Sequence, residues 1–285
     1  MNTMGILGPR GTHSEEAAMK LNGILPEPVK IEIFSEIFEV LNAVEDGRVD
    51  SGFVPVENSL EGAINITLDT LAGSDKMIVV REVIVPIKNY LMTKPETNLS
   101  GIKRIYSHAQ PISQCRNYLR ANFSGAELCA VQSTARAAEI VSESGQDEGA
   151  AAICTESAGK ICGLVTRAEE IRDNPANCTR FFEVRRKDEV LQTDNAGDKV
   201  LIVCRIDGSR PGALCEVLEE FSSRKVNMTR IESRPARTQL GEYIFFFDLE
   251  ISDNIFSVKD SVASVRKKSI MLKNLGTFPV IRFDV

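Results

Sequence analysis

The chain has 285 residues, of which 43% are hydrophobic and 26% charged, and its formal net charge is −6. These values are typical of a globular protein with one large domain or two ordinary ones. Charges of both signs are spread along the chain, which excludes the basic stripe of a nucleic-acid-binding protein, and the apolar stretch from Met77 to Ile87 is too short to span a bilayer.

The cysteines and histidines argue against a metal centre. Seven cysteines are scattered without a C-x-x-C pair, and His13 and His108 are the only histidines in the sequence. Scattered single cysteines are typical of reduced thiols in the cytosol. The start of the chain lacks the basic and apolar blocks of a signal peptide. We therefore expect a cytoplasmic protein that binds no metal, no nucleic acid and no membrane.

Strand and helix patterns alternate along the chain as far as Cys154. Apolar runs predict strands, and apolar residues at helical spacing after a capping residue predict helices; Thr12-x-x-Glu15 has the spacing of a capping box. The expected strands are 4–7, 29–33, 51–54, 77–80, 83–87, 102–106, 128–131 and 150–154, and the expected helices begin after Thr12, Ser35, Ser107 and Ser133. The alternation occurs twice, which predicts two α/β lobes and a ligand crevice at the carboxyl ends of their strands.

The remainder of the chain has a different pattern. A short strand at 181–184 is expected to return to the first lobe, and the polar segment 185–198 is expected to be a linker. The elements predicted beyond it are a strand at 200–204, a helix at 214–221, strands near 227–233 and 243–249, a helix near 255–265 and a last strand near 278–283. This βαββαβ order is the ferredoxin-like plan.

Several polar motifs lie where predicted strands meet helices. Gly8-Pro9-Arg10-Gly11-Thr12 offers backbone donors and an arginine at a helix N-terminus, which suits a carboxylate, although a plain strand–helix turn is the alternative. Glu57-Asn58-Ser59 is either a site or a solvated loop. His108 is either a general acid or a satisfied helix-capping residue, and Ser133-Thr134 most simply caps its helix.

The segment Asn177-Cys178-Thr179-Arg180-Phe181 joins a hydroxyl and a guanidinium at the entry to the returning strand. Arginine offers a rigid fork of donors to a carboxylate or phosphate, and a threonine hydroxyl can donate to an oxygen of the same ligand. A surface loop with a capping threonine is the alternative.

Taken in order, these motifs resemble those of the prephenate dehydratases. The C-terminal unit is similar to the regulatory ACT domain that is fused to them, with Gly212-Ala213-Leu214-Cys215 and Glu232-Ser233-Arg234-Pro235 resembling its two phenylalanine-site motifs. Pattern and resemblance together predict an α/β fold with a two-lobed, periplasmic-binding-protein-like catalytic domain and a C-terminal α+β ferredoxin-like ACT domain. The expected boundaries are 2–184 for the catalytic domain (lobe one about 2–78 plus 178–184, lobe two about 79–177), 185–198 for the linker and 199–278 for the ACT domain, with its last strand reaching about 284.

The resemblance implies a carbon–oxygen lyase that converts prephenate to phenylpyruvate, water and carbon dioxide without a cofactor. It implies a hydrogen-bonding or proton-relay role for Thr179, with Arg180 orienting it or a substrate carboxylate and Glu57 as a second candidate acid. The other residues expected to bind substrate are Thr12, Asn58, Ser59, Ser133 and Phe181.

The resemblance also implies an allosteric site for L-phenylalanine, with inhibition as the expected effect. The residues expected to form it are Gly212, Ala213, Leu214, Asn227, Glu232, Ser233 and Arg234. ACT domains commonly pair, so a homodimer or homotetramer is expected. Two other functions stay open: an arogenate dehydratase, and a non-catalytic two-lobed protein that binds a small dicarboxylate.

Three residues depart from the pattern of the family. His13 stands where the family usually has an aromatic residue, Ala109 replaces a proline after His108, and Cys215 replaces an aliphatic residue in the first phenylalanine motif. The first changes local polarity, the second weakens a role for His108, and the third keeps a small hydrophobic side chain.

Overall fold

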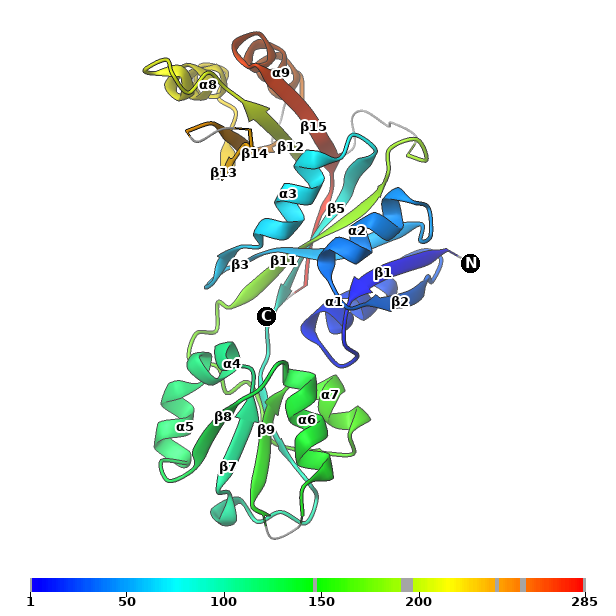
Figure 1. Cartoon of the computed structure of the whole chain (residues 1–285), viewed down its shortest axis with the longest axis vertical. Helices are drawn as coiled ribbons and strands as arrows, with labels where there is room; N and C mark the ends of the chain where they lie inside the picture. Colours follow the sequence, from blue (N-terminus) through cyan, green and yellow to red (C-terminus); the bar gives the residue numbers. More distant parts are fainter. Residues whose placement is uncertain (1, 146–147, 191–196, 239–240, 252–254, 284–285) are drawn as a thin grey trace. The chain divides into compact units, whose positions relative to one another are not determined.

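The computed structural model of the chain describes residues 2–145, 148–190, 197–238, 241–251 and 255–283 (Figure 1). The described residues form two compact units. The first unit takes in the chain up to Glu36 together with Val85–Thr179, and the second takes in Ile37–Ile84 together with Arg180–Phe283.

The first unit begins with a strand–helix–strand element. β1 (Thr3–Leu7) and β2 (Lys30–Phe34) pair in parallel, and α1 (His13–Asn22) connects them. Met4, Ile6 and Leu21 are fully buried, because apolar residues on one side of the strand and one side of the helix face each other. This element presents the turn at residues 8–12 at the start of α1.

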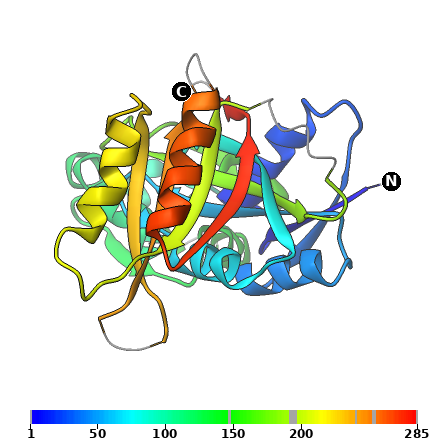
Figure 2. The ribbon, with the colours of Figure 1, turned by 90° about the horizontal axis from the view of Figure 1, so that it is seen from above.

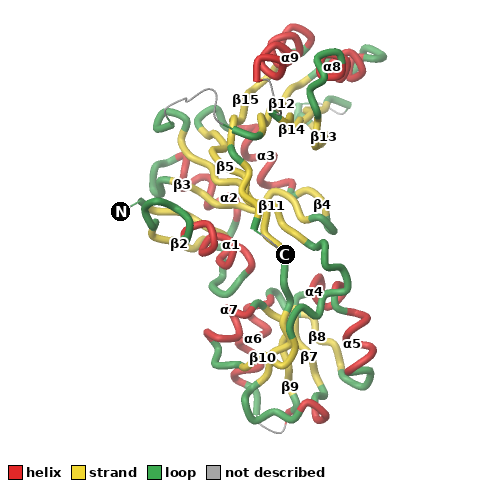
Figure 3. The backbone as a smooth tube through the Cα atoms, turned by 180° about the vertical axis from the view of Figure 1, so that it is seen from behind, coloured by secondary structure: helices red, strands yellow, loops and turns green. Residues whose placement is uncertain are grey.

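The rest of the first unit is a five-stranded sheet in the order β10-β6-β9-β7-β8. Its strands are β6 (Tyr90–Thr93), β7 (Arg104–Ser107), β8 (Glu127–Ala130), β9 (Ala150–Cys154) and β10 (Val165–Ala168). Figure 3 shows helices on both faces of this sheet. The helices are α4 (Ala109–Gln114), α5 (Arg116–Asn122), α6 (Thr134–Glu143) and α7 (Glu156–Ile161), with the short 3-10 helix η1 (Leu99–Gly101) before β7. Two separate apolar clusters line the two faces, since the residues of β9 point alternately to either side.

The second unit contains strands of two sheets, one of mixed strand direction and one antiparallel. The strands β3 (Ser51–Asn58), β5 (Met77–Pro86), β11 (Cys178–Arg186) and β16 (Val280–Arg282) run in the order β16-β5-β11-β3, and the two-residue β4 (Gly62–Ala63) pairs with β3. The helices α2 (Ile37–Glu45) and α3 (Asn65–Gly73) precede and follow β3.

The antiparallel sheet of the second unit has the order β13-β14-β12-β15. Its elements are β12 (Lys199–Arg205), α8 (Ala213–Ser222), β13 (Met228–Pro235), β14 (Tyr243–Glu250), α9 (Ile255–Lys268) and β15 (Met271–Phe278). Both helices cover one face of the sheet, as Figure 2 shows, and Val217, Phe221, Val258 and Val265 pack there against Phe247. The predicted βαββαβ order, and with it the predicted fold class, is confirmed.

The last strand of this sheet is not where the sequence pattern put it. The pattern predicted a strand near 278–283, whereas β15 ends at Phe278 and residues 280–282 form β16 on the other sheet, in parallel with β5. Pro279 separates the two strands because it has no backbone donor for a continuous ladder. The apolar run therefore serves two sheets in succession.

Other local predictions also differ from the structure. The segment 77–87, predicted as two pieces, is the single strand β5 followed by Ile87, and the helix expected after Ser107 is divided at Cys115 into α4 and α5. The elements α3, β6, α7 and β10 were not predicted; α7 and β10 are short, and their apolar residues show no clear period. The linker prediction falls partly outside the described residues, and β11 extends into it as far as Arg186.

Candidate functional site

The segment that enters β11 is held by buried polar contacts within the first unit. Asn177 is 1% exposed; its amide nitrogen donates to Oε1 of Gln114 at 2.9 Å, and its carbonyl accepts from the backbone of Ile87 at 2.9 Å and from Arg172 at 3.2 Å. Arg172 also donates to the carbonyl of Ile87 at 2.7 Å. These contacts fix the backbone immediately before Thr179, which is itself 8% exposed.

Gln114 was not predicted as a site residue. It is the last residue of α4, where the sequence pattern marked its apolar neighbours and gave no reason to select an amide. Its contact with Asn177 links the helix after His108 to the segment that carries Thr179. The bond joins residues 63 positions apart, so local sequence could not reveal it.

The glycine-rich turn before α1 packs on the start of α7. The hydroxyl of Thr155, the N-cap of α7, accepts from the backbone of Ala158 at 3.0 Å and donates to the carbonyl of Gly11 at 2.5 Å. The backbone of Ser157 donates to Glu16 at 3.2 Å. Gly11 has φ +78°, and a Cβ there would lie 2.7 Å from the Cα of Ala158. Only glycine fits this close approach without strain.

The capping box predicted at the start of α1 does not form as expected. The hydroxyl of Thr12 donates to the carbonyl of Pro9 at 3.0 Å and makes no bond to the helix, while the carboxylate of Glu15 accepts from the backbone of Gly11 at 2.5 Å. Thr12 lies beside the glycine turn as predicted. Its hydroxyl stabilises this turn through the hydrogen bond to Pro9.

A buried polar group lies behind the turn. The pKa of His13 falls from its ordinary value near 6.5 to about 4 because burial disfavours the imidazolium, and a hydrogen bond with Asn89 offsets this only in part. The side chain of Asn89 is fully buried, and burial raises the pKa of the neighbouring Cys115 to about 12. His13 therefore carries a neutral imidazole near pH 7. This polar ring stands where the resembled family usually has an aromatic residue.

Arg180 is the centre of an ion-pair network in the second unit. Its Nη1 donates to Glu57 at 2.6 Å, and its Nη2 donates to Glu82 at 2.6 Å and to Asp248 at 2.5 Å. Burial opposes the charged guanidinium, but Asp248 and Glu82 outweigh this effect and raise the pKa of Arg180. The cation is thus held by three protein carboxylates.

Glu82 and Lys199 extend this network. Lys199 donates to the second carboxylate oxygen of Glu82 at 2.9 Å, and Glu82 is fully buried. Burial alone would raise the pKa of Glu82, but the charges and hydrogen bonds of Arg180 and Lys199 lower it below its usual range. A fully buried carboxylate in this state depends on both cations.

The structure brings the predicted residues Glu57 and Arg180 into direct contact. The same oxygen of Glu57 that accepts from Arg180 lies 3.3 Å from Nε of Arg230. Glu57 and Asn58 lie within β3, where a loop was expected, and Oδ1 of Asn58 accepts from the backbone of Leu60 at 3.0 Å. Asn58 therefore stabilises the turn in which Ser59 lies.

Two other predicted substrate contacts have structural roles. Ser133 is the N-cap of α6, and its hydroxyl accepts from the backbone of Arg136 at 3.0 Å, which agrees with the simple capping interpretation. Phe181 is 1% exposed and stacks on Phe53 with ring centroids 4.9 Å apart. Its ring belongs to a core, which differs from the predicted contact with substrate.

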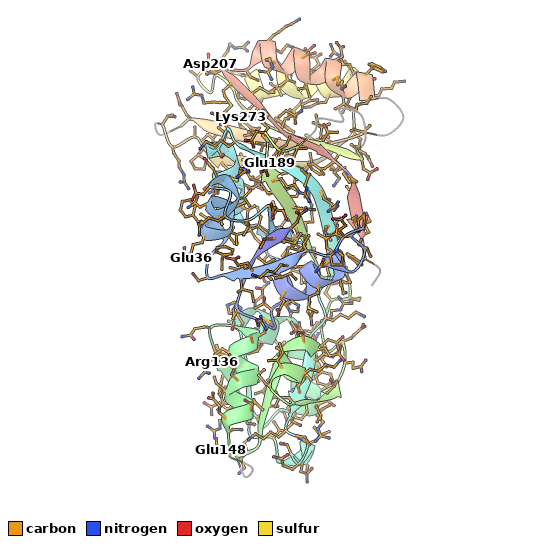
Figure 4. All side chains as sticks on the ribbon, turned by 90° about the vertical axis from the view of Figure 1, so that its right-hand side faces the viewer. Glu36, Arg136, Glu148, Glu189, Asp207 and Lys273 are labelled. Atoms are coloured by element: carbon orange, nitrogen blue, oxygen red, sulfur yellow. The ribbon has the colours of Figure 1, made fainter. Side chains whose placement is uncertain are left out.

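The first phenylalanine motif lines a cavity of about 370 Å³ beside α8. Gly212, with φ +83°, begins the helix, and Asp207, labelled in Figure 4, lies on the approach to it. The lining residues that the structure describes are Ile206, Asp207, Gly208, Arg210, Gly212, Ala213, Leu214, Cys215, Gly241, Tyr243 and Phe245. The cavity is therefore partly apolar with polar groups at one end, and Cys215 lines it as a small side chain.

The second phenylalanine motif, on β13, does not contribute to this lining. Arg234 donates through two nitrogens to the carboxylate of Asp69 on α3, each at 3.0 Å, and Asn227 donates to Glu250 at 2.7 Å. Lys273 of β15, labelled in Figure 4, adds a bond to the carbonyl of Ala72 at 2.8 Å. The motif residue Arg234 thus joins the antiparallel sheet to α3.

Neither a metal centre nor a membrane span is found in the part of the chain that the structure describes. No group of three or more His, Cys, Asp or Glu side chains there could hold a metal ion, and none of its helices combines the length and apolar character needed to cross a membrane.

The chain therefore combines α/β elements with a C-terminal βαββαβ unit, which has the order of a ferredoxin-like domain. The family model "Prephenate dehydratase" matches residues 4–189 and the model "ACT domain" matches residues 200–266. The chain belongs to the prephenate dehydratase family.

Individual relatives agree over nearly the whole chain. A bifunctional chorismate mutase/prephenate dehydratase of Stutzerimonas stutzeri is 37% identical over 275 residues, which are 96% of this chain and 72% of that protein. A prephenate dehydratase of Methanocaldococcus jannaschii is 34% identical, covering 95% of this chain and 96% of its own. The crystal structure of an Arthrobacter aurescens prephenate dehydratase in complex with L-Phe has a TM-score of 0.86 at 35% identity, covering 97% of this chain and 90% of that one.

Proposed function

We propose that this protein is a prephenate dehydratase, a lyase that converts prephenate to phenylpyruvate, water and carbon dioxide. The observation that carries the proposal is the match of the family model over residues 4–189, which include each of the catalytic motifs. The proposed role of this chain is supported by the fixed backbone before Thr179 and by the ion-pair network after it.

The reaction breaks two bonds and forms an aromatic ring. The electron pair of the carbon–carboxylate bond enters the ring as carbon dioxide leaves, and the ring carbon opposite loses its hydroxyl group, which takes up a proton and departs as water. Aromatisation makes this fragmentation favourable, so the protein must chiefly help the hydroxyl group to leave. A hydrogen bond from a positioned donor to the leaving oxygen supplies this help.

Thr179 is proposed to be that donor. Its hydroxyl is a weak acid, so hydrogen bonding to the leaving oxygen, with relay of a proton, is the role that its chemistry permits. Thr12, Asn58, Ser59 and Ser133 are proposed to support substrate binding, in part by stabilising the turns and helix starts around it. Binding L-phenylalanine between paired ACT domains, with inhibition and a dimer or tetramer, is also proposed, since the Arthrobacter relative was crystallised with L-Phe.

The contacts of Arg180 favour an orienting role. Its two terminal nitrogens donate to three carboxylates, so three of the five N–H groups of the side chain are engaged by the protein itself. Glu57 accepts from Arg180 and lies beside Arg230, and a carboxylate held between two guanidinium groups is a better anchor than proton donor. We propose that both residues position the site and that Thr179 contacts the leaving group.

The direct test is an assay of purified protein with prephenate. We expect phenylpyruvate to form, more slowly when L-phenylalanine is present, and a higher rate with prephenate than with arogenate. Quantitative recovery of unchanged prephenate would refute the enzyme proposal in favour of a binding protein. A higher rate with arogenate would assign the chain to that substrate.

Replacement of Thr179 tests its role. We expect Thr179→Val and Thr179→Ala to lower kcat on the order of 100-fold or more, because each removes the hydroxyl, and Thr179→Ser to stay within roughly tenfold of the wild type. Steady-state kinetics with prephenate measure this, and circular dichroism checks the fold. Equal loss in the serine and valine variants would contradict the role of the hydroxyl.

A further inference from the structure

The face of the ACT sheet opposite its helices carries buried charges. The side chains of Lys199 in β12, Arg230 in β13 and Asp248 in β14 are 9%, 7% and 1% exposed. Their strand neighbours Val200, Phe247 and Leu249 face the helices and belong to the apolar cluster beneath α8 and α9. Because strand residues alternate between faces, the three charged side chains share the other face.

Each of these three side chains meets a residue of the catalytic domain on a different strand. Lys199 donates to Glu82 of β5 at 2.9 Å, and Asp248 accepts from Arg180 of β11 at 2.5 Å. Arg230, whose register partner on β14 is Asp248, lies 3.3 Å from Glu57 of β3. We call these six residues, Lys199, Arg230, Asp248, Glu57, Glu82 and Arg180, the ionic cluster.

The ionic cluster contains three cations and three anions, so its formal charge is zero. Arg180 bonds to Glu57, Glu82 and Asp248 and is the member that joins the others. Charges removed from water are stable only when they are paired and hydrogen-bonded, so the loss of one member leaves an uncompensated charge in the cluster. The arrangement of Arg180 therefore depends on the ACT sheet.

The strand β11 has two faces with different surroundings. Arg180 and Phe182 lie on one face: the guanidinium lies 5.8 Å from the centre of the Phe182 ring, and that ring packs on Phe278 at the end of β15. Thr179 and Phe181 point to the other face, where Phe181 stacks on Phe53. The ACT sheet thus contacts β11 on the face opposite to the one to which Thr179 points.

We propose that Asp248 and Arg230 of the ACT sheet are positioning residues for catalysis, since they hold Arg180 and Glu57 and through them the strand that carries Thr179. The inference depends on the proposed dehydratase function and adds to it two residues outside the catalytic domain. Neither side chain needs to touch the substrate. Each acts through a residue of a catalytic motif.

The positioning role predicts a specific kinetic effect. A misplaced Thr179 binds the substrate nearly as well but stabilises the leaving oxygen poorly, so kcat falls while KM changes little. A contact that only docks the two domains would affect stability without this separation of kcat from KM. The pair of Arg234 and Asp69 is such a contact, because it joins the ACT sheet to α3 without touching a residue of the ionic cluster.

The experiment compares Asp248→Asn with Asp69→Asn in the full chain, with prephenate as substrate. Asp248→Asn keeps the shape and removes the charge; we expect kcat to fall at least tenfold and KM to change less than threefold, with partial rescue of kcat in Asp248→Glu. Asp69→Asn is expected to lower the melting temperature by about as much as Asp248→Asn does, and to keep kcat within twofold of the wild type. A folded Asp248→Asn variant with wild-type kcat, or equal losses of kcat in both variants, would overturn the proposal.

A second variant covers the case in which Asp248→Asn does not fold. Arg230→Gln removes the guanidinium beside Glu57 and leaves Arg180 with its three acceptors. We expect kcat to fall at least fivefold with KM little changed, and wild-type kcat in this folded variant would overturn the proposal. A wild-type protein that forms no phenylpyruvate would instead refute the dehydratase function itself.

Discussion

Thr179 and Arg180 are adjacent in the sequence and differ completely in their surroundings. The backbone before Thr179 is fixed by Gln114 and Arg172, whereas Arg180 is fixed by carboxylates from three other strands. The hydroxyl and the guanidinium were expected to face one ligand together. Alternation along β11 points them to opposite sides, which agrees with the proposal that Thr179 contacts the leaving group and that Arg180 positions the site.

At the same scale, His13 makes stability depend on pH. Its pKa is about 4 in the folded protein and near 6.5 when unfolded, so between these values the unfolded chain binds more protons. Stability from this residue is therefore lost as pH falls from 6.5 toward 4, by on the order of 1 to 3 kcal/mol. We expect His13→Phe to be more stable than the wild type, and we expect this difference in the free energy of unfolding to grow as pH falls from 6.5 toward 4.

Chemical denaturation at several pH values between 4 and 7 measures this difference. The carboxylate of Glu16 lies 3.8 Å from the imidazole of His13, and burial raises the pKa of this carboxyl group, so its protonation also affects how stability depends on pH. The comparison is therefore repeated after Glu16→Gln is introduced into the wild type and into the His13→Phe variant. A stability difference between the histidine and phenylalanine proteins that does not vary with pH would contradict the prediction.

Among the elements, the turn before α1 is closely restricted by packing. Gly11 combines a left-handed backbone with a close approach to Ala158 of α7, so a side chain there would meet both backbone strain and steric overlap. We expect Gly11→Ala to lower the free energy of unfolding by about 2 to 4 kcal/mol, since left-handed strain and steric overlap add. Urea denaturation measures the change.

Gly163 provides the matched control for that prediction. It also has a positive φ, +69°, but a Cβ there would meet no atom within 4 Å. We expect Gly163→Ala to cost only the backbone strain, roughly 1 kcal/mol. If both variants lose the same stability, the contact with Ala158 contributes nothing.

For the whole molecule, the cavity beside α8 predicts a thermodynamic response to L-phenylalanine. A ligand that binds only the folded state stabilises it, by about 2.7 kcal/mol at a concentration one hundred times its Kd. We expect L-phenylalanine to raise the melting temperature and to lower the rate with prephenate, and Leu214→Ala, which removes part of the apolar lining, to weaken both effects. D-phenylalanine serves as the control. A melting temperature that L-phenylalanine leaves unchanged would contradict the binding of this ligand to the folded protein.

The sequence by itself determined the fold class. Apolar periods of two and of 3.6 residues marked most strands and helices, because these periods follow from backbone geometry alone. The order βαββαβ predicted a ferredoxin-like domain, and the resemblance of its motifs to a known family indicated that this is an ACT domain. The motifs, each at a strand or helix end, identified the family in order along the chain. Elements with short or irregular apolar patterns, such as α7 and β10, carried no such signal.

Only the tertiary structure decided the partners of the charged residues. An aspartate within the apolar strand at 243–250 could have been recognised as unusual, but its partner Arg180 lies 68 positions away. Periodicity shows that a side chain faces inward and does not show which strand it will meet, since that choice depends on how whole sheets pack. For this reason the sequence selected Thr179, Arg180 and Glu57 as candidates, whereas only the structure showed that Arg180 meets Asp248 and that Glu57 meets Arg230.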